Sequence, residues 1–132
     1  MILRGRKVMG GVAEAEALVS PEPVSFYGGV DPVTGCITEP GHCCCGENIT
    51  GKVFVFPQGK GSTVGSYVIY RMKKLGTAPA AIVNAETEAI IATGCVISDI
   101  PLVDKLDRDP LQVIETGMRV RVDADQGTVE TL

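Results

Sequence analysis

The sequence contains no tryptophan, and only 5% of its 132 residues are aromatic, so its hydrophobic core must be built from Val, Ile, Leu and Ala. An excess of positive charge is also missing, because the formal net charge is -4. That balance gives no electrostatic reason to bind nucleic acid or an anionic membrane surface. An anionic substrate would need a local cation or the N-terminus of a helix.

Long hydrophobic runs are absent too. No stretch approaches the 18 or so apolar residues of a membrane span, and the first residues lack the apolar region and cleavage site of a signal peptide. We therefore expect a cytoplasmic protein without a membrane segment. With 132 residues, 45% of them hydrophobic and 21% charged, the chain is expected to form one domain over residues 1–132.

The cysteines lack the C-x-x-C spacing of a zinc or redox site. There are five: Cys36, Cys43, Cys44, Cys45 and Cys95. Consecutive side chains of an extended segment point to opposite sides, so Cys43 to Cys45 are not expected to share one metal ion. We predict that this chain binds no metal, while an intermolecular role for one thiol stays open. The single histidine, His42, is expected to be a solvated loop residue.

Turn-forming residues dominate the segment between Gly28 and Gly51, which contains "GGVDPVTG", "EPGH" and "CCCGENITG". An irregular stretch of this length inside a compact domain is usually functional. We predict a loop region that contacts a partner or covers a site. The preceding residues are expected to form two strands around Gly10 and Gly11, then a short strand over 22–27.

The rest of the chain alternates strand and helix patterns. Buried strands are expected at "KVFVFP", "PAAIVN" and "IPLVDKL", residues 86–97 are ambiguous, and the tail forms a hairpin around "DADQG". Val64, Val68, Met72 and Leu75 would share one face of a helix that Ser62 caps and Gly76 ends. The predicted fold class is α/β, with a mixed sheet, flanking helices and a C-terminal β-hairpin.

The stretch "PQGKGSTVGSY", residues 57–67, joins a predicted strand to this helix. It is not a P-loop, because Gly61 separates Lys60 from Ser62. Ser62 is either a simple helix cap or a hydroxyl placed in the field of a helix N-terminus. In the second case Gly59, Lys60, Gly61 and Thr63 are candidates for substrate binding or for stabilising its alkoxide. A serine-hydrolase triad is not supported, since no G-x-S-x-G motif occurs.

Several segments together resemble the small, swivel-domain subunit of the aconitase X family. They are "GGVAEAEALVS", "SFYGGVDPVTG", "EPGH", "GKVFVFPQGKGSTVGSYVIY", "APAAIVN" and "IPLVDKL", of which "VFPQGKGSTVGSYV" is the most specific. The resemblance covers nearly the whole chain and implies a swivelling β/β/α domain. It also implies a hydro-lyase that is active only as a heterodimer with a large subunit, which would carry a [4Fe-4S] cluster and most of the substrate pocket.

In that family the small subunit supplies a proton-accepting serine, and the matching residue is Ser62. The reaction implied is the dehydration of a small anionic substrate, with cluster iron polarising the departing hydroxyl. Archaeal members with separate subunits convert (R)-5-phosphomevalonate to trans-anhydromevalonate 5-phosphate in the mevalonate pathway; others act on cis-3-hydroxy-L-proline. This chain alone leaves the substrate open. The run Cys43 to Cys45 departs from the family pattern, so the family gives it no role.

Two other classes compete with a dehydratase subunit. Residues 82 to 122 broadly resemble the swivelling phosphohistidine carriers, but residues 84–92 contain no histidine to be phosphorylated. A non-catalytic module that docks a partner through the Gly28 to Gly51 loops remains the other alternative.

Overall fold

The computed structural model describes residues 1–132 and contains eight strands and four helices. The strands are β1 (Ile2–Arg4), β2 (Arg6–Met9), β3 (Val12–Val19), β4 (Val53–Phe56), β5 (Ala81–Asn84), β6 (Leu102–Asp104), β7 (Arg119–Asp123) and β8 (Thr128–Thr131). The helices are α1 (Phe26–Gly29), α2 (Gly65–Leu75), α3 (Ala89–Ser98) and α4 (Pro110–Val113). None of these helices is both long and apolar enough to cross a lipid bilayer.

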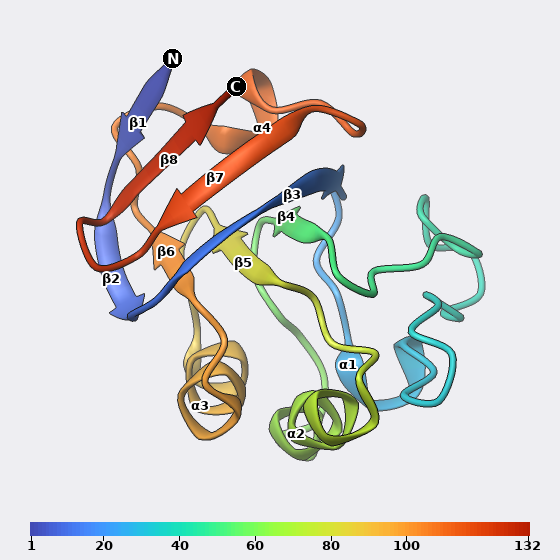
Figure 1. Ribbon diagram of the computed structural model, residues 1–132. Helices are drawn as coiled ribbons and strands as arrows, with labels where there is room; N and C mark the ends of the chain where they lie inside the picture. Colours follow the sequence, from blue (N-terminus) through green and yellow to red (C-terminus); the bar gives the residue numbers. More distant parts are fainter.

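All eight strands belong to one mixed sheet with the order β1-β8-β7-β3-β4-β5-β6-β2. Strands β3 to β6 are parallel, whereas the remaining pairs are antiparallel. Only Gly5 separates β1 from β2, so the two ends of the sheet are drawn together and the sheet curls (Figure 1). Glycine is required there, because a Cβ at position 5 would collide with the carbonyl oxygen of Asp104.

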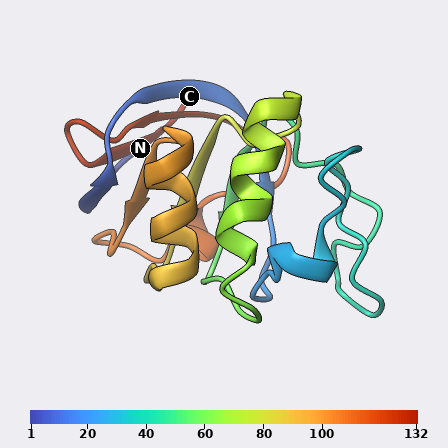
Figure 2. The same cartoon turned by 90° about the horizontal axis from the view of Figure 1, so that it is seen from below.

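The curled sheet separates two hydrophobic cores. Val53 and Val55 of β4 face the core enclosed by the sheet, while Phe54 and Phe56 face the core shared with the helices. Every residue of β4 is therefore buried, which explains its uninterrupted apolar sequence. Helices α2 and α3 lie side by side on one face of the sheet (Figure 2). Gly94 of α3 allows this approach, since a Cβ there would lie 2.6 Å from Cδ1 of Ile69.

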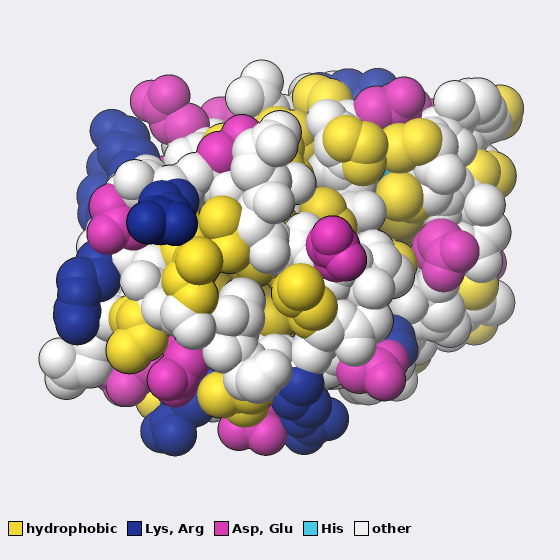
Figure 3. Space-filling view, turned by 90° about the horizontal axis from the view of Figure 1, so that it is seen from above, with side chains coloured by type: hydrophobic (Ala, Val, Ile, Leu, Met, Phe, Trp, Pro, Cys, Tyr) yellow, Lys and Arg dark blue, Asp and Glu magenta, His cyan; other side chains and the backbone are white.

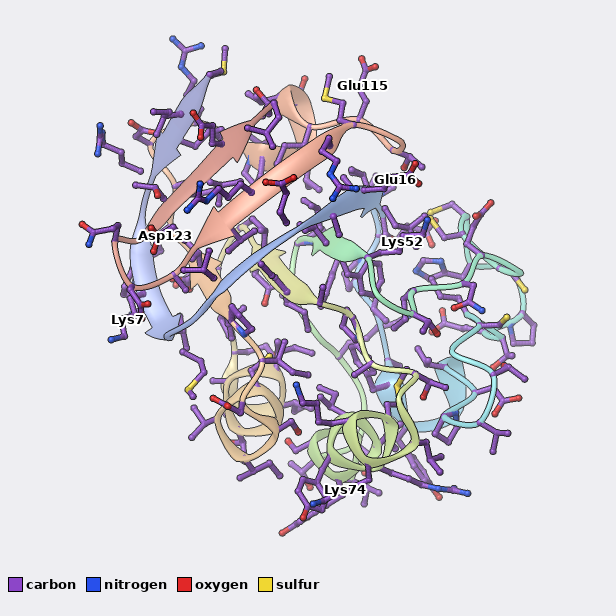
Figure 4. The ribbon with its side chains drawn as sticks, in the orientation of Figure 1. Lys7, Glu16, Lys52, Lys74, Glu115 and Asp123 are labelled. Atoms are coloured by element: carbon purple, nitrogen blue, oxygen red, sulfur yellow. The ribbon has the colours of Figure 1, made fainter.

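Residues 30–52 follow α1 as a loop region that extends beyond the sheet, with isolated bridges but no regular strand (Figure 1). It is not a purely surface feature, because Val30, Ile37 and Ile49 are buried in the core on the helix side. Lys52, at its end, pairs with Glu16 of β3 at 3.0 Å, and both side chains lie at the end of β3 in Figure 4. The predicted irregular loop region is confirmed. Its buried apolar side chains attach it to the core, and the ion pair of Lys52 attaches its end to β3.

The predicted α/β class, with its mixed sheet, flanking helices and C-terminal hairpin, is confirmed. Two local predictions are wrong, and one helix was missed. The N-terminal segment forms three strands instead of two, residues 22–27 contain a single bridge and the start of α1, and residues 110–113 form a helix that was not predicted. Acidic and basic side chains are interspersed on the face over the sheet, which gives it no uniform charge (Figure 3).

Candidate active site

Ser62 lies in the exposed turn between β4 and α2. Its Oγ accepts a hydrogen bond from the N–H of Val64 at 3.1 Å, and its carbonyl accepts from the N–H of Gly65 at 3.0 Å. Helix α2 begins at Gly65, and Val64 occupies its N-cap position. The prediction that Ser62 is the N-cap is therefore wrong. Instead, the hydrogen bond to the Ser62 hydroxyl closes a local turn just before the helix, and the Ser62 side chain is exposed to solvent.

Three consecutive backbone N–H groups of this turn have no acceptor in the chain: those of Gly61, Ser62 and Thr63. All three residues are exposed. Successive unpaired N–H groups at the start of a helix favour negative charge, since the helix dipole adds to their own partial positive charge. The turn can therefore stabilise an oxyanion or hold an anionic group of a ligand.

The residues that precede Ser62 are held from two sides. Val24 donates its N–H to the carbonyl of Gln58 at 3.2 Å and accepts the N–H of Lys60 at 3.1 Å. On the other side, the N–H of Gly59 donates to Oε1 of Glu88 at 2.9 Å. The glycine loop is thus fixed between the segment before α1 and the start of α3.

Lys60 connects the glycine loop to the long loop region. Its Nζ lies 3.0 Å from Oε2 of Glu39, which belongs to residues 28–51. The two segments that the sequence marked as functional therefore meet in space. The amine is directed at Glu39, so part of its charge is already compensated within the chain.

A pocket of about 260 Å³ opens beside the turn, between the first turns of α2 and α3. Its lining residues are Thr63, Ser66, Tyr67, Ala89, Ile90 and Thr93. The hydroxyl of Ser66 donates to the carbonyl of Ile90 at 2.7 Å and so links α2 to α3 beside the pocket. Of the predicted site residues, Thr63 is the one that reaches this pocket.

His42 is not the solvated residue that the sequence suggested. Only 5% of its surface is exposed, and Nε2 lies 3.1 Å from the carbonyl oxygen of Pro23. Its Nδ1 accepts the N–H of Cys44 at 3.0 Å, which leaves Nε2 as the nitrogen that donates to Pro23. Both ring nitrogens are used to hold the loop together.

The cysteines also differ from their expected arrangement. Residues 42–46 form turns, so Sγ of Cys43 and Sγ of Cys44 lie 3.8 Å apart, close to His42. Burial raises the pKa of the Cys44 thiol to about 11, and that thiol donates to the carbonyl of Val19. Since iron–sulfur clusters are held by several thiolates, these side chains do not fit such a cluster.

Comparison with known proteins identifies the family. A family model described as the aconitase X swivel domain matches residues 2–131. The chain belongs to the aconitase X swivel-domain family.

Relatives and solved structures of this family match the chain over its whole length. A protein of Thermococcus kodakarensis named phosphomevalonate dehydratase small subunit is 57% identical over 132 residues, covering 100% of this chain and 97% of the relative. A protein of Methanococcoides burtonii with the same name is 54% identical over 127 residues, covering 96% and 93%. The crystal structure of Thermococcus kodakaraensis aconitase X in its holo-form superimposes with a TM-score of 0.95 at 56% identity, covering 100% of this chain and 98% of that chain.

Two site residues were missed by sequence reasoning, Glu39 and Glu88. The contact of Glu88 with Gly59 spans 29 positions, and that of Glu39 with Lys60 spans 21. No local pattern encodes such pairs, so the aconitase X fold was needed to find them.

Replacing Gly61 with alanine should displace Ser62 and lower turnover by about tenfold or more. Gly61 has a φ of +86°, and a Cβ there would lie 2.6 Å from Oγ of Ser25. The strained backbone should also cost about 1–2 kcal/mol of stability. Steady-state kinetics and thermal unfolding would measure both effects.

Gly117→Ala is the matched control, because Gly117 has a φ of +96° with open space around it. It should lose similar stability and keep its turnover. Equal turnover in the two variants would show that the position of the glycine loop is unimportant.

Proposed function

We propose that the chain is the small subunit of a dehydratase that converts (R)-5-phosphomevalonate to trans-anhydromevalonate 5-phosphate, and that Ser62 accepts the proton. The observation that carries this proposal is the match to relatives named phosphomevalonate dehydratase small subunit at 50–57% identity along nearly the whole chain. The open turn that holds Ser62 supports it. The cis-3-hydroxy-L-proline alternative has no such support.

In the proposed reaction, Ser62 as an alkoxide removes a proton from the carbon beside the carboxylate. The electron pair of that C–H bond forms the new C=C bond, and the hydroxyl on the next carbon leaves with its bonding pair as hydroxide. The proton taken up by Ser62 then passes to this hydroxide, which gives water and restores the alkoxide. A serine is a poor base unless its alkoxide is stabilised. The N–H of Val64 already donates to Oγ, and the unpaired N–H groups around it and the start of α2 add to this field.

Gly59, Lys60, Gly61 and Thr63 are the residues that we propose beside Ser62. Gly59 permits the loop to approach α3, and Gly61 permits it to turn. Thr63 extends the site into the pocket, and Lys60 adds a cation at its edge. We assign the [4Fe-4S] cluster and most of the substrate pocket to a larger partner subunit, because this chain offers no suitable set of thiolates.

The decisive test is to co-express the chain with its large partner subunit, reconstitute the complex anaerobically and measure water loss. (R)-5-Phosphomevalonate should be dehydrated, whereas cis-3-hydroxy-L-proline should not. Turnover of the hydroxyproline alone would replace the proposed substrate. Full activity of the large subunit by itself would leave this chain as a docking module.

Partner binding should protect the face around Ser62 from hydrogen exchange. Exposed aromatic side chains flank this turn, with Tyr27 56% and Tyr67 68% exposed, and such residues are enriched in interfaces. We expect new protection in residues 28–51 and 59–67 when the large subunit is added, measured by mass spectrometry. Protection restricted to the hairpin of β7 and β8 would place the interface elsewhere.

A further inference from the structure

Glu88 holds one carboxylate between two elements of the proposed site. Its Oε2 accepts the N–H of Ile90 at 2.7 Å, and its Oε1 accepts the N–H of Ile91 at 3.4 Å, so it caps α3. The same Oε1 accepts the N–H of Gly59 at 2.9 Å. Three backbone donors from two separate segments therefore converge on one side chain.

The glycine loop is shaped for this contact. Gly59 is buried, and a Cβ at that position would lie 2.6 Å from Oε1 of Glu88 and 2.7 Å from Cγ1 of Ile91. Only glycine can come this close to the start of α3. Since Val24 binds Gln58 and Lys60 on the opposite side, Glu88 supplies the hydrogen bond on the side of α3.

The segment before Glu88 is itself rigidly anchored. The N–H of Thr87 donates to Oδ2 of Asp104 at 2.8 Å, and Arg6 binds both oxygens of that carboxylate at 2.9 and 2.8 Å. Burial alone would raise the pKa of Asp104, but the bonds from Arg6 and Thr87 outweigh it and lower that pKa. The anchor therefore stays charged at neutral pH and fixes the backbone from which Glu88 extends.

We propose that Glu88 is a positioning residue for Ser62, which it places by holding Gly59 against the first turn of α3. This inference rests on the proposed function. In this role the carboxylate of Glu88 does not act on the substrate. Its hydrogen bond with Gly59 sets where the glycine loop lies relative to the pocket and to the partner. Because small displacements of a reacting group cost large factors in rate, loss of this contact should lower kcat more than it changes KM.

Glu88→Asp separates the two roles of the side chain. Aspartate is a good N-cap, so α3 should stay capped and the unfolding midpoint should stay close to that of the wild type. The side chain is one methylene shorter and cannot also reach Gly59. In the reconstituted complex we expect kcat to fall by about tenfold to a hundredfold, with a much smaller change in KM.

Glu88→Gln tests the same contact at constant size. Both oxygens of Glu88 accept N–H groups, so an amide must turn its NH₂ group toward one of these donors, and kcat should fall in this variant as well. Asp109→Ala is the control, because Asp109 caps α4 by accepting the N–H of Leu111 at 2.9 Å and has no contact with the glycine loop. It should lose a helix cap without losing turnover.

Amide exchange of Gly59, followed by NMR in the full chain, gives a readout that does not depend on activity. The Gly59 amide should be protected in the wild type and exchange faster in Glu88→Asp. Wild-type kcat in Glu88→Asp, or a loss no larger than that in Asp109→Ala, would overturn the positioning role. If the wild-type complex itself fails to dehydrate phosphomevalonate, the proposed function is wrong, and the Gly59 amide still decides whether Glu88 holds the loop.

Discussion

Replacing Ser62 with alanine should lower kcat of the reconstituted complex by about 10² to 10⁴, the usual contribution of a general base. The free energy of unfolding should fall by no more than about 1 kcal/mol, because only one exposed hydrogen bond, from the N–H of Val64, is lost. Kinetics at saturating large subunit and thermal unfolding of the same preparations would measure the two quantities. A large loss of rate with little loss of stability identifies a chemical role.

Two further variants exclude a purely structural explanation. Ser62→Asp can still accept the N–H of Val64, so it should fold normally and yet lose most of its activity through altered reach and charge. Asp109 makes the same kind of contact outside the proposed interface, since its Oδ1 accepts the N–H of Leu111 at 2.9 Å. Asp109→Ala should therefore lose a comparable local hydrogen bond and keep kcat. Near-normal turnover in Ser62→Ala would remove the catalytic assignment.

The sequence predicted those elements whose burial follows from local pattern. Val53 to Phe56 are apolar at every position because both faces of β4 are covered, and the C-terminal hairpin alternates because only one face is covered. Gly76 ends α2 in the left-handed conformation, with a φ of 79°. These signals are contained in neighbouring residues, so they could be read without the fold.

The buried face of α2 could not be predicted in the same way. Met72 is buried as expected, but Val64 and Leu75 are 44% and 52% exposed. Gly65, Ser66 and Ile69 are buried instead, and Ile90 of α3 approaches Gly65 so closely that the first turn favours small side chains. The exposed side chains of Val64 and Leu75 suit a helix whose outer face is covered by the partner subunit that we propose.

The site shows the same division between local and long-range information. Ser62 was predicted because "GKGS" is a contiguous motif, and the family resemblance implied a role for it. The contacts of Glu88 with Gly59 and of His42 with Pro23 join distant segments, so composition and spacing gave no sign of them. Sequence reasoning therefore led to the proposed hydroxyl, and the fold was needed to identify the contacts that hold the glycine loop in place.

Without its large subunit, the chain should remain a folded monomer. Its dehydratase rate should lie at least about 10³-fold below that of the complex. Ser62 lies in an open turn, and water around an alkoxide there would favour its protonated form. Enclosing the site is therefore part of what the partner must supply. Anaerobic assays of the chain alone, of the large subunit alone and of the mixture would measure this dependence.

The same preparation should contain no stoichiometric iron or zinc after exposure to a chelator. Cys44 has a thiol whose pKa is raised to about 11, and burial also raises the pKa of the Cys95 thiol within α3, so neither is a thiolate at neutral pH. His42 would have to give up the N–H of Cys44 before Nδ1 could bind a metal. Elemental analysis of the isolated chain, with a Cys43→Ser and Cys44→Ser double variant as control, tests this directly. One equivalent of metal that survives the chelator and disappears in the double variant would show that the cluster of His42, Cys43 and Cys44 is a metal site after all.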